Sequence, residues 1–228
     1  QHHASLIIWC GGNELMCADE YAPLDERHPA IARMGDVVRA MDPTRRYLAT
    51  SPSGPAVHFN PENAGKGVHW DVHGPWKPPE SLDKWAEYWA SDDALARTEL
   101  GSPGASSVDI IRRFVGECQE VPGTFENAYW RRGSTWWIEW PVFVLERGRE
   151  PESLEEYVDW SQKRQAEALS IAVGACRRRF PKCGAAIVWM GHDCYPCTAN
   201  TSIIDYDGEP KPAALAVSKV FREPLNNA

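Results

Sequence analysis

The sequence predicts an α/β fold in which parallel strands alternate with helices. Apolar runs at residues 5–10 (SLIIWC) and 185–190 (AAIVWM) suit strands that are covered on both faces, which is the pattern of a parallel sheet. Amphipathic stretches lie between the strands, and such strand–helix alternation builds either a (β/α) barrel or a doubly wound sheet. No glycine-rich phosphate loop follows a predicted strand, which disfavours nucleotide binding.

Five strands and four helices are expected in order along the chain. The strands are expected at residues 5–10, 47–51, 67–72, 95–98 and 185–190. The helices are expected at residues 28–41, 80–89, 108–118 and 155–179. Apolar residues recur every three or four positions in the first helix until Asp42-Pro43 ends it. The last helix ends in three arginines, which favour the negative end of a helix dipole and indicate a helix terminus over a nucleic-acid patch.

A tryptophan-rich segment separates the last two predicted helices. We expect an irregular insertion at about residues 120–151, with its tryptophans packed against the domain. Glu139 lies between two of them and is expected at a rim. The four tryptophans of this segment are Trp130, Trp136, Trp137 and Trp140.

Composition limits the classes of function. The 228 residues are 43% hydrophobic and 25% charged, which is ordinary for a globular domain with a buried core. A net charge of −8 without a basic block argues against nucleic acid as a partner. No apolar run approaches the ~20 residues of a membrane-spanning helix. Seven scattered cysteines cannot form a complete set of disulfides, and the CxxC pair Cys194 and Cys197 is expected to be unpaired or incidentally paired.

Two glutamates stand at predicted strand ends. Glu14 follows the first strand and Glu99 ends the fourth, each near glycines that let a ligand approach. The carboxyl ends of the strands carry the catalytic residues of a parallel barrel. Cleavage of a glycosidic bond needs one protonated carboxyl for the leaving oxygen and one carboxylate for the oxocarbenium-like carbon. The pair therefore predicts a two-carboxylate glycosidase.

Aromatic and polar residues surround the same strand ends. Tryptophan rings pack against the C–H faces of sugars, and Trp9, Trp70 and Trp189 lie at or near strand ends. Arg97 precedes Glu99 by two positions and so points to the same side of the strand, where it is expected to lower the pKa of a nearby carboxylate. The remaining candidates for substrate contacts are Asn13, His69, His73, His192 and Asp193.

Several motifs, in order, resemble glycoside hydrolase family 2. The run at residues 3–14 (HASLIIWCGGNE) resembles the family's HPS-apolar-W-x-GNE signature at barrel strand four. The run at 98–101 (TELG) is similar to the SEFG of strand seven, and 42–45 (DPTR) to the DPTRPY before strand five. The stretch 68–74 (VHWDVHG) resembles the GDVHYWDVWHG of the β-mannosidase branch, and 186–205 the segment W-x-x-ND…S-x-x-DY-G of strand eight.

The resemblance implies a retaining exo-acting β-glycosidase without a metal or organic cofactor. It implies Glu14 as the acid/base and Glu99 as the nucleophile, with Asn13 bound to the sugar 2-position. Trp189 would form the floor under the terminal sugar, and Tyr21 would replace a loop aromatic of the β-mannosidase branch. The implied hydroxyl contacts are His69 and Asp193, with His73 as the alternative to His69.

Departures from the family pattern leave alternatives open. His192 replaces the Asn of the strand-eight motif, and Leu100 replaces the aromatic residue after the nucleophile. These changes favour a catalytically inactive carbohydrate-binding or scaffold barrel as the second hypothesis. A metal-dependent hydrolase is a third, and it needs clustered His and Asp ligands. The galactosidase, glucuronidase and glucosaminidase branches share the two-glutamate core, so the sugar is open.

The resemblance also implies a (β/α)₈ TIM barrel of which residues 1–228 form the C-terminal portion, about strands four to eight. A complete barrel takes ~250 residues. Half a barrel would leave a sheet edge unpaired and an apolar interior uncovered. We therefore expect a piece of a longer protein, which needs the upstream barrel strands and accessory β-domains of the same protein.

Overall fold

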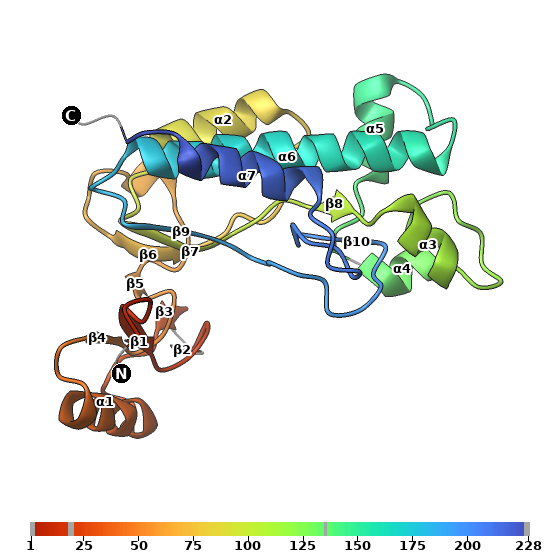
Figure 1. The fold of residues 1–228 in the computed structure, drawn as a ribbon. Helices are drawn as coiled ribbons and strands as arrows, with labels where there is room; N and C mark the ends of the chain where they lie inside the picture. The colour runs from red at the N-terminus through yellow and green to blue at the C-terminus, as the bar shows by residue number, and fades with distance from the viewer. Residues whose placement is uncertain (1–2, 18–20, 135, 226–228) are drawn as a thin grey trace. The chain divides into compact units, whose positions relative to one another are not determined.

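The computed structural model describes residues 3–17, 21–134 and 136–225 (Figure 1). The chain divides into two compact units. The first unit consists of Gln1–Gly74, Ser91–Thr98 and Pro181–Ala185, and the second of Pro75–Ala90, Glu99–Phe180 and Ala186–Ala228.

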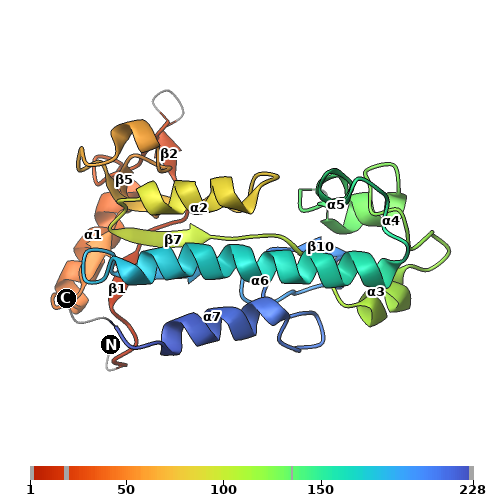
Figure 2. The ribbon, with the colours of Figure 1, turned by 90° about the horizontal axis from the view of Figure 1, so that it is seen from above.

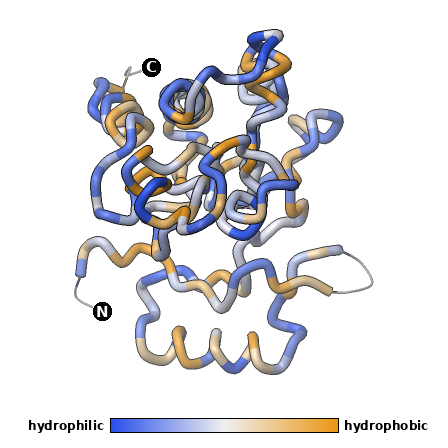
Figure 3. The backbone as a smooth tube through the Cα atoms, turned by 90° about the vertical axis from the view of Figure 1, so that its right-hand side faces the viewer, coloured by the Kyte–Doolittle hydropathy of each residue, from blue (hydrophilic) through white to orange (hydrophobic). Residues whose placement is uncertain are grey.

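A parallel strand pair joined by a helix forms the start of the first unit. Strand β1 (Ile8–Cys10) pairs in parallel with β4 (Arg46–Leu48), with Trp9 opposite Tyr47. Helix α1 (Pro29–Met41) connects them and ends at Asp42, as the Asp-Pro step predicts. Hydrophobic residues recur between hydrophilic ones along α1, at the bottom of Figure 3. The predicted parallel β–α–β unit is therefore confirmed.

Short elements complete the first unit. Strands β2 (Met16–Cys17) and β3 (Ala22–Pro23) form an antiparallel hairpin, and β5 (Gly54–Pro55) pairs antiparallel with β6 (His69–His73). A 3₁₀ turn, η1, covers Pro61–Asn63. A four-stranded sheet has the order β5-β6-β7-β9, and its strands β7 (Ala96–Leu100) and β9 (Ala185–Val188) continue from the first unit into the second.

Helices dominate the second unit. The 25-residue helix α6 (Leu154–Arg178) begins at Ser153, whose hydroxyl accepts from the Glu156 N–H, and ends in the predicted arginines. Helix α7 (Pro212–Arg222) runs alongside α6 (Figure 2). The other elements are α2 (Leu82–Ser91), β8 (Gly104–Ala105), α3 (Val108–Phe114), α4 (Ala128–Ser134), α5 (Trp140–Arg147) and β10 (Ala199–Asn200).

The tryptophan-rich segment supplies the main core of the second unit. Trp130 and Trp140 are buried and pack against Tyr157 of α6, with ring centroids 5.6 and 4.7 Å apart. The predicted packing role is confirmed for these two residues. The segment is helical at α4 and α5 where an irregular path was expected, because tertiary burial of the aromatic rings outweighs their weak helix propensity.

The described residues show a mixed α/β fold and no closed barrel. The predicted strands all form but are shorter or displaced by up to three residues, and α7 was not predicted. All seven cysteines are free thiols, Cys194 and Cys197 among them. Within the described ranges, no helix has the length and apolar character needed to cross a bilayer.

Candidate active site

Glu14 is held by its backbone at the end of the β1–β4 pair. Its φ of +50° lies in the left-handed region, which non-glycine residues rarely adopt. Its N–H donates to the Ser51 carbonyl at 2.7 Å, and the Ser51 N–H donates to the Gly12 carbonyl at 3.0 Å. These bonds tie the loop after β1 to the residues after β4, so they fix an otherwise costly conformation.

The Glu14 side chain contacts His73 at the end of β6. Glu14 Oε1 lies 2.9 Å from His73 Nδ1. The glutamate side chain is 38% exposed, whereas that of His73 is 1% exposed. Of the two histidines that the sequence left open, His73 therefore faces the predicted acid/base.

Behind His73 lies a row of hydrogen-bonded side chains. His73 Nε2 is 2.9 Å from Ser51 Oγ, and the Ser51 hydroxyl donates to Thr98 Oγ1 at 2.9 Å. The Thr98 hydroxyl donates to Asp71 Oδ1, and the Ser53 N–H donates to Asp71 Oδ2 at 3.0 Å. Residues that follow β1 and β4 and residues on β6 and β7 thus form one polar cluster.

His69 has protein partners on both ring nitrogens. Its Nδ1 lies 2.6 Å from Asp93 Oδ1, and its Nε2 accepts from the Asn60 N–H at 3.3 Å. The ring also packs on Phe59, with centroids 4.8 Å apart. His69 is 2% exposed. The structure gives it a buried place beside Asp93, and its predicted contact with a sugar hydroxyl stays a prediction.

Arg97 is fully buried and pairs with Asp92. Its Nη2 donates to Asp92 Oδ1 at 2.6 Å, and its Nη1 donates to the Gly74 carbonyl at 2.5 Å. The guanidinium also lies 5.4 Å from the Phe59 ring centroid. The carboxylate next to Arg97 is thus Asp92. Because Gly74 follows His73, Arg97 also holds the end of β6.

Two of the tryptophans in the first unit have backbone or side-chain partners. Trp9 Nε1 donates to Asp42 Oδ2 at 3.0 Å, at the end of α1. Trp70 Nε1 donates to the Gly67 carbonyl at 2.9 Å, and half of Trp70 is exposed. Asn13 is exposed beside Glu14 and bridges Ser51 through its backbone.

Glu99 lies on β7 in the second unit. It is half-buried and is followed by fully buried Leu100, whose carbonyl accepts from the Trp189 N–H at 2.8 Å. Gly101, directly after β7, lies close to the residue that follows β9: a Cβ on Gly101 would be 2.7 Å from the Trp189 carbonyl oxygen. Glu14 belongs to the first unit, so the separation of roughly 5–5.5 Å between the carboxyls of a retaining pair remains a prediction.

Trp189 lies in a cluster of three tryptophans in the second unit. Its ring centroid is 6.5 Å from that of Trp76 and 5.7 Å from that of Trp137. All three rings are partly exposed, whereas Trp136 is 78% exposed. The tryptophan-rich segment therefore contributes one ring, Trp137, to the surroundings of the predicted sugar floor.

Asp193 is buried and is bound by other side chains. Its Oδ1 accepts from the Ser202 hydroxyl at 2.5 Å and from Asn200 Nδ2 at 3.1 Å. Its Oδ2 lies 3.4 Å from the Lys211 ammonium. His192 is exposed. The structure thus gives Asp193 a buried ion pair that holds the start of α7, and its predicted sugar contact stays a prediction.

Glu139 is buried, which corrects its expected position at a rim. Its side chain is 1% exposed, and Oε1 lies 3.6 Å from Arg164 Nε. Arg164 also binds Glu146 and the Pro79 carbonyl. Burial raises the pKa of Glu139 to about 7, although the positive charges of Arg164 and Lys77 oppose this.

The change Glu139→Gln is expected to stabilise the fold at alkaline pH. Because the folded-state pKa of Glu139 lies above the unfolded value of about 4.5, unfolding free energy falls as pH rises from 4.5 to 7. The variant should gain up to about 3 kcal/mol over wild type at pH 8 and little below pH 5. Thermal melts across this range measure it. Glu167→Gln, at an exposed position of α6, is the control, and equal pH slopes in Glu139→Gln and wild type would contradict the prediction.

Sequence reasoning missed four residues of the polar cluster in the first unit. These are Ser51, Asp71, Thr98 and His58. Asp71 precedes His73 by two positions and so shares its side of β6, which is a signal that alternation could have given. His58 Nδ1 lies 3.1 Å from the His73 carbonyl oxygen, and its Nε2 lies 3.1 Å from the exposed Tyr21 hydroxyl.

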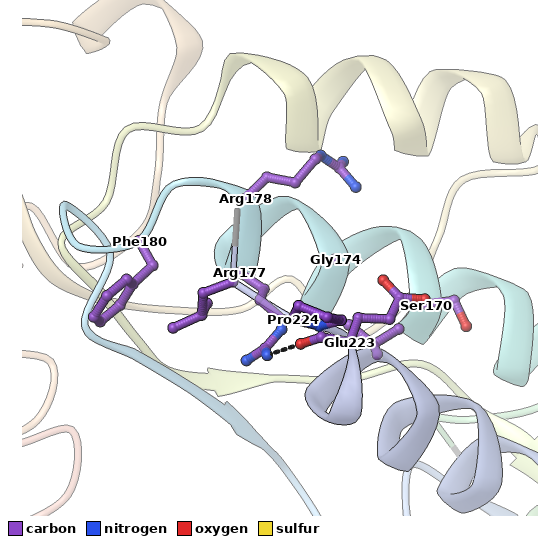
Figure 4. Close-up of a pocket in the computed structure, with 9 residues that line it drawn as sticks. Ser170, Gly174, Arg177, Arg178, Phe180, Glu223 and Pro224 are labelled. Carbon is purple, nitrogen blue, oxygen red and sulfur yellow. Dashed lines mark hydrogen bonds between the residues drawn. The ribbon is translucent and has the colours of Figure 1, made fainter. Parts of the chain in front are cut away.

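Hollows occur in both units of the described part of the chain. One of about 670 Å³ is at the C-terminal ends of α6 and α7, where Arg177 binds the Glu223 carbonyl (Figure 4). None of the predicted site residues lines it. Another, of about 400 Å³, is in the first unit and is lined by residues of β1, β4 and β6 and by the start of β7. Its lining includes Ile8, Trp70 and Leu95 and also Asp71 of the polar cluster.

Comparisons with known proteins agree with the motifs. Over 97% of its length the chain is 26% identical to beta-mannosidase B of Neosartorya fischeri and to beta-mannosidase B of Emericella nidulans. The beta-D-mannosidase of Dictyoglomus thermophilum has a similar fold, with a TM-score of 0.68 and 22% identity over 98% of this chain and 28% of that chain. No family model matches. The chain spans 28% of the length of the curated relatives. The predicted resemblance to β-mannosidases is confirmed over nearly the whole chain.

Proposed function

We propose that this chain, which resembles β-mannosidases over 97% of its length, carries the catalytic residues of a retaining exo-β-glycosidase for terminal β-mannosides. The observation that carries the proposal is the position of Glu14. It stands at the carboxyl end of a parallel strand pair, in a constrained backbone conformation, and its carboxyl contacts a buried histidine. Catalytic acids in parallel barrels occupy such strand ends.

The proposed reaction is a double displacement. Glu99 attacks the anomeric carbon while Glu14 gives its proton to the leaving oxygen, which forms a glycosyl–enzyme ester. Glu14 then takes a proton from water, and the oxygen of that water displaces Glu99. The sugar leaves with its configuration retained. Asn13 would bind the sugar 2-position, and Trp189 would lie under the ring.

The proposed architecture is a (β/α)₈ barrel in which β1, β4, β6, β7 and β9 are strands four to eight. The parallel β1–β4 pair and the apolar hollow shared by four of these strands support this assignment. Ile8, Trp70 and Leu95 are about half exposed there, so strands from elsewhere in the protein would cover them. A crystal structure of the natural-length protein tests this. A β1 edge that pairs with no further strand would refute it.

The proposed activity is tested with chromogenic glycosides. The natural-length protein that contains this chain is incubated with the p-nitrophenyl β-glycosides of mannose, galactose, glucuronic acid and N-acetylglucosamine. We expect turnover with the mannoside, and proton NMR should show the β-anomer as the first product. The Glu14→Gln, Glu99→Ala double variant serves as the blank. Sugar binding without turnover of any glycoside would support the inactive barrel that His192 and Leu100 favour.

A further inference from the structure

We propose that Asp71, Thr98, Ser51 and His73 form a hydrogen-bonded chain that keeps one proton shared between His73 and Glu14. All of these residues belong to the first unit. The inference rests on the proposed role of Glu14 as the acid/base. It makes Asp71, Thr98 and Ser51 positioning residues, because they act on Glu14 only through His73.

The direction of the chain follows from what each group can donate. Asp71 accepts as a carboxylate, so Thr98 gives it its one hydroxyl proton. Thr98 Oγ1 then accepts from the Ser51 hydroxyl at 2.9 Å. Since the single proton of Ser51 is used there, Ser51 Oγ accepts from His73 Nε2 at 2.9 Å. The network thus assigns a proton to Nε2 of His73.

This assignment determines what Glu14 can do. A neutral imidazole with its proton on Nε2 presents a lone pair at Nδ1. His73 Nδ1 lies 2.9 Å from Glu14 Oε1, so a hydrogen bond there requires one more proton. Either the Glu14 carboxyl donates to Nδ1, or an imidazolium donates to the carboxylate. Both arrangements hold the same number of protons, and losing that proton leaves a lone pair opposite a carboxylate.

Burial limits reversal of the hydrogen-bonded chain at two of its members. Asp71 is 4% exposed and His73 is 1% exposed, so water competes little for their side chains, whereas Ser51 and Thr98 are half-buried. The Ser53 N–H donates to the second Asp71 oxygen at 3.0 Å, so both Asp71 oxygens accept hydrogen bonds. The ionisable groups around the chain are His58 at the His73 carbonyl, Tyr21 at His58, Arg97 paired with Asp92, and Glu99 after Thr98 on β7.

The proton balance fits both steps of the proposed reaction. In the first step the shared proton passes to the leaving oxygen, which leaves Glu14 ionised and His73 neutral. In the second step the attacking water returns one proton to the pair as its oxygen bonds to the anomeric carbon. With Glu14 ionised and His73 neutral, the returned proton takes the position between Glu14 Oε1 and His73 Nδ1.

The variant Thr98→Val tests the chain in the natural-length protein. Without the Thr98 oxygen, Ser51 is free to donate to Nε2, and His73 then carries its neutral proton on Nδ1, toward ionised Glu14. The pair therefore loses its extra proton at lower pH. We expect the alkaline limb of the kcat/KM profile to move down by about one pH unit, equal to about tenfold lower activity on that limb. Thr98→Ser should restore the wild-type profile. An unchanged profile in Thr98→Val overturns the proposal.

A matched control and a second measurement separate this proposal from the proposed function. The Thr44 hydroxyl also donates to an aspartate, Asp42, at 2.9 Å, but Thr44 is no member of the hydrogen-bonded chain that ends at Glu14. Thr44→Val should therefore leave the pH profile of kcat/KM unchanged. NMR of ¹⁵N-histidine-labelled protein reports the His73 tautomer without any turnover, with the signal assigned from His73→Gln. A neutral Nε2–H or an imidazolium in wild type supports the proposal, and a neutral Nδ1–H overturns it. If no glycoside is hydrolysed, the proposed function fails, but the NMR measurement of the His73 tautomer still tests the proposed hydrogen-bonded chain.

Discussion

The change Glu99→Ala is expected to lower kcat for a p-nitrophenyl β-mannoside by as much as roughly 10⁶-fold, the size of the loss when a nucleophile is removed from a hydrolase. In the proposed mechanism Glu99 forms the bond to the anomeric carbon, and a methyl group cannot replace it. KM should change far less, because the carboxylate acts mainly in the transition state. Steady-state kinetics of the purified protein measure both constants.

A small anion identifies the role of Glu99 more sharply than the loss of activity. Azide fits the space that the carboxylate leaves in Glu99→Ala and attacks from the same face of the sugar. The expected product is a glycosyl azide of inverted, α configuration, and proton NMR distinguishes the anomers. Glu167→Ala, at an exposed position of α6, should retain wild-type kcat. Normal turnover in Glu99→Ala refutes the assignment.

The change Glu14→Gln is expected to cost less and to depend on the leaving group. General acid–base catalysis contributes typically 10²–10⁴-fold, so a loss of about that size is expected for substrates with a poor leaving group. A dinitrophenolate needs no proton, so formation of the glycosyl–enzyme should proceed at nearly the wild-type rate with that substrate. The glutamine amide can still donate to His73 Nδ1, which preserves the local structure. Stopped-flow release of the phenol separates the two steps.

The second step gives the distinguishing result for Glu14. In Glu14→Gln the glycosyl–enzyme should accumulate, since no base activates water. Added azide needs no base and should release a β-glycosyl azide of retained configuration. An α product here, or equal losses for all leaving groups, would contradict the acid/base assignment.

The strands and the first helix were predictable because local signals specify them. Apolar runs and the Asp42-Pro43 step act within a few residues, and β1, β4 and α1 follow them. The helices α4 and α5 were not predictable from local signals, because they depend on the packing of Trp130 and Trp140 against Tyr157, which is distant in sequence. The prediction of a rim position for Glu139 was wrong because it also depends on a residue distant in sequence. Arg164 of α6 pairs with the buried Glu139 carboxylate.

Sequence motifs located Glu14 after β1 and Glu99 on β7, and the catalytic roles of both stay predictions. The side chains around His73 were much harder to predict. The partners of His73 come from three different strands or strand ends, so Ser51, Thr98 and Asp71 meet only in the folded sheet. Arg97 lies on the predicted strand, β7, but the sequence could not reveal that Asp92 pairs with it.

The left-handed backbone conformation at Glu14 means that the residue best for fold stability differs from the residue that the proposed chemistry needs. Asparagine tolerates this conformation better than glutamate, and glycine adopts it freely, so either would relieve on the order of 1 kcal/mol of strain. Neither has the carboxyl that the proposed chemistry needs. Selection for folding stability alone would therefore favour Asn or Gly over Glu at position 14. A substitution to Asn or Gly at position 14 in a related sequence would mark a lineage that kept the scaffold after giving up hydrolysis.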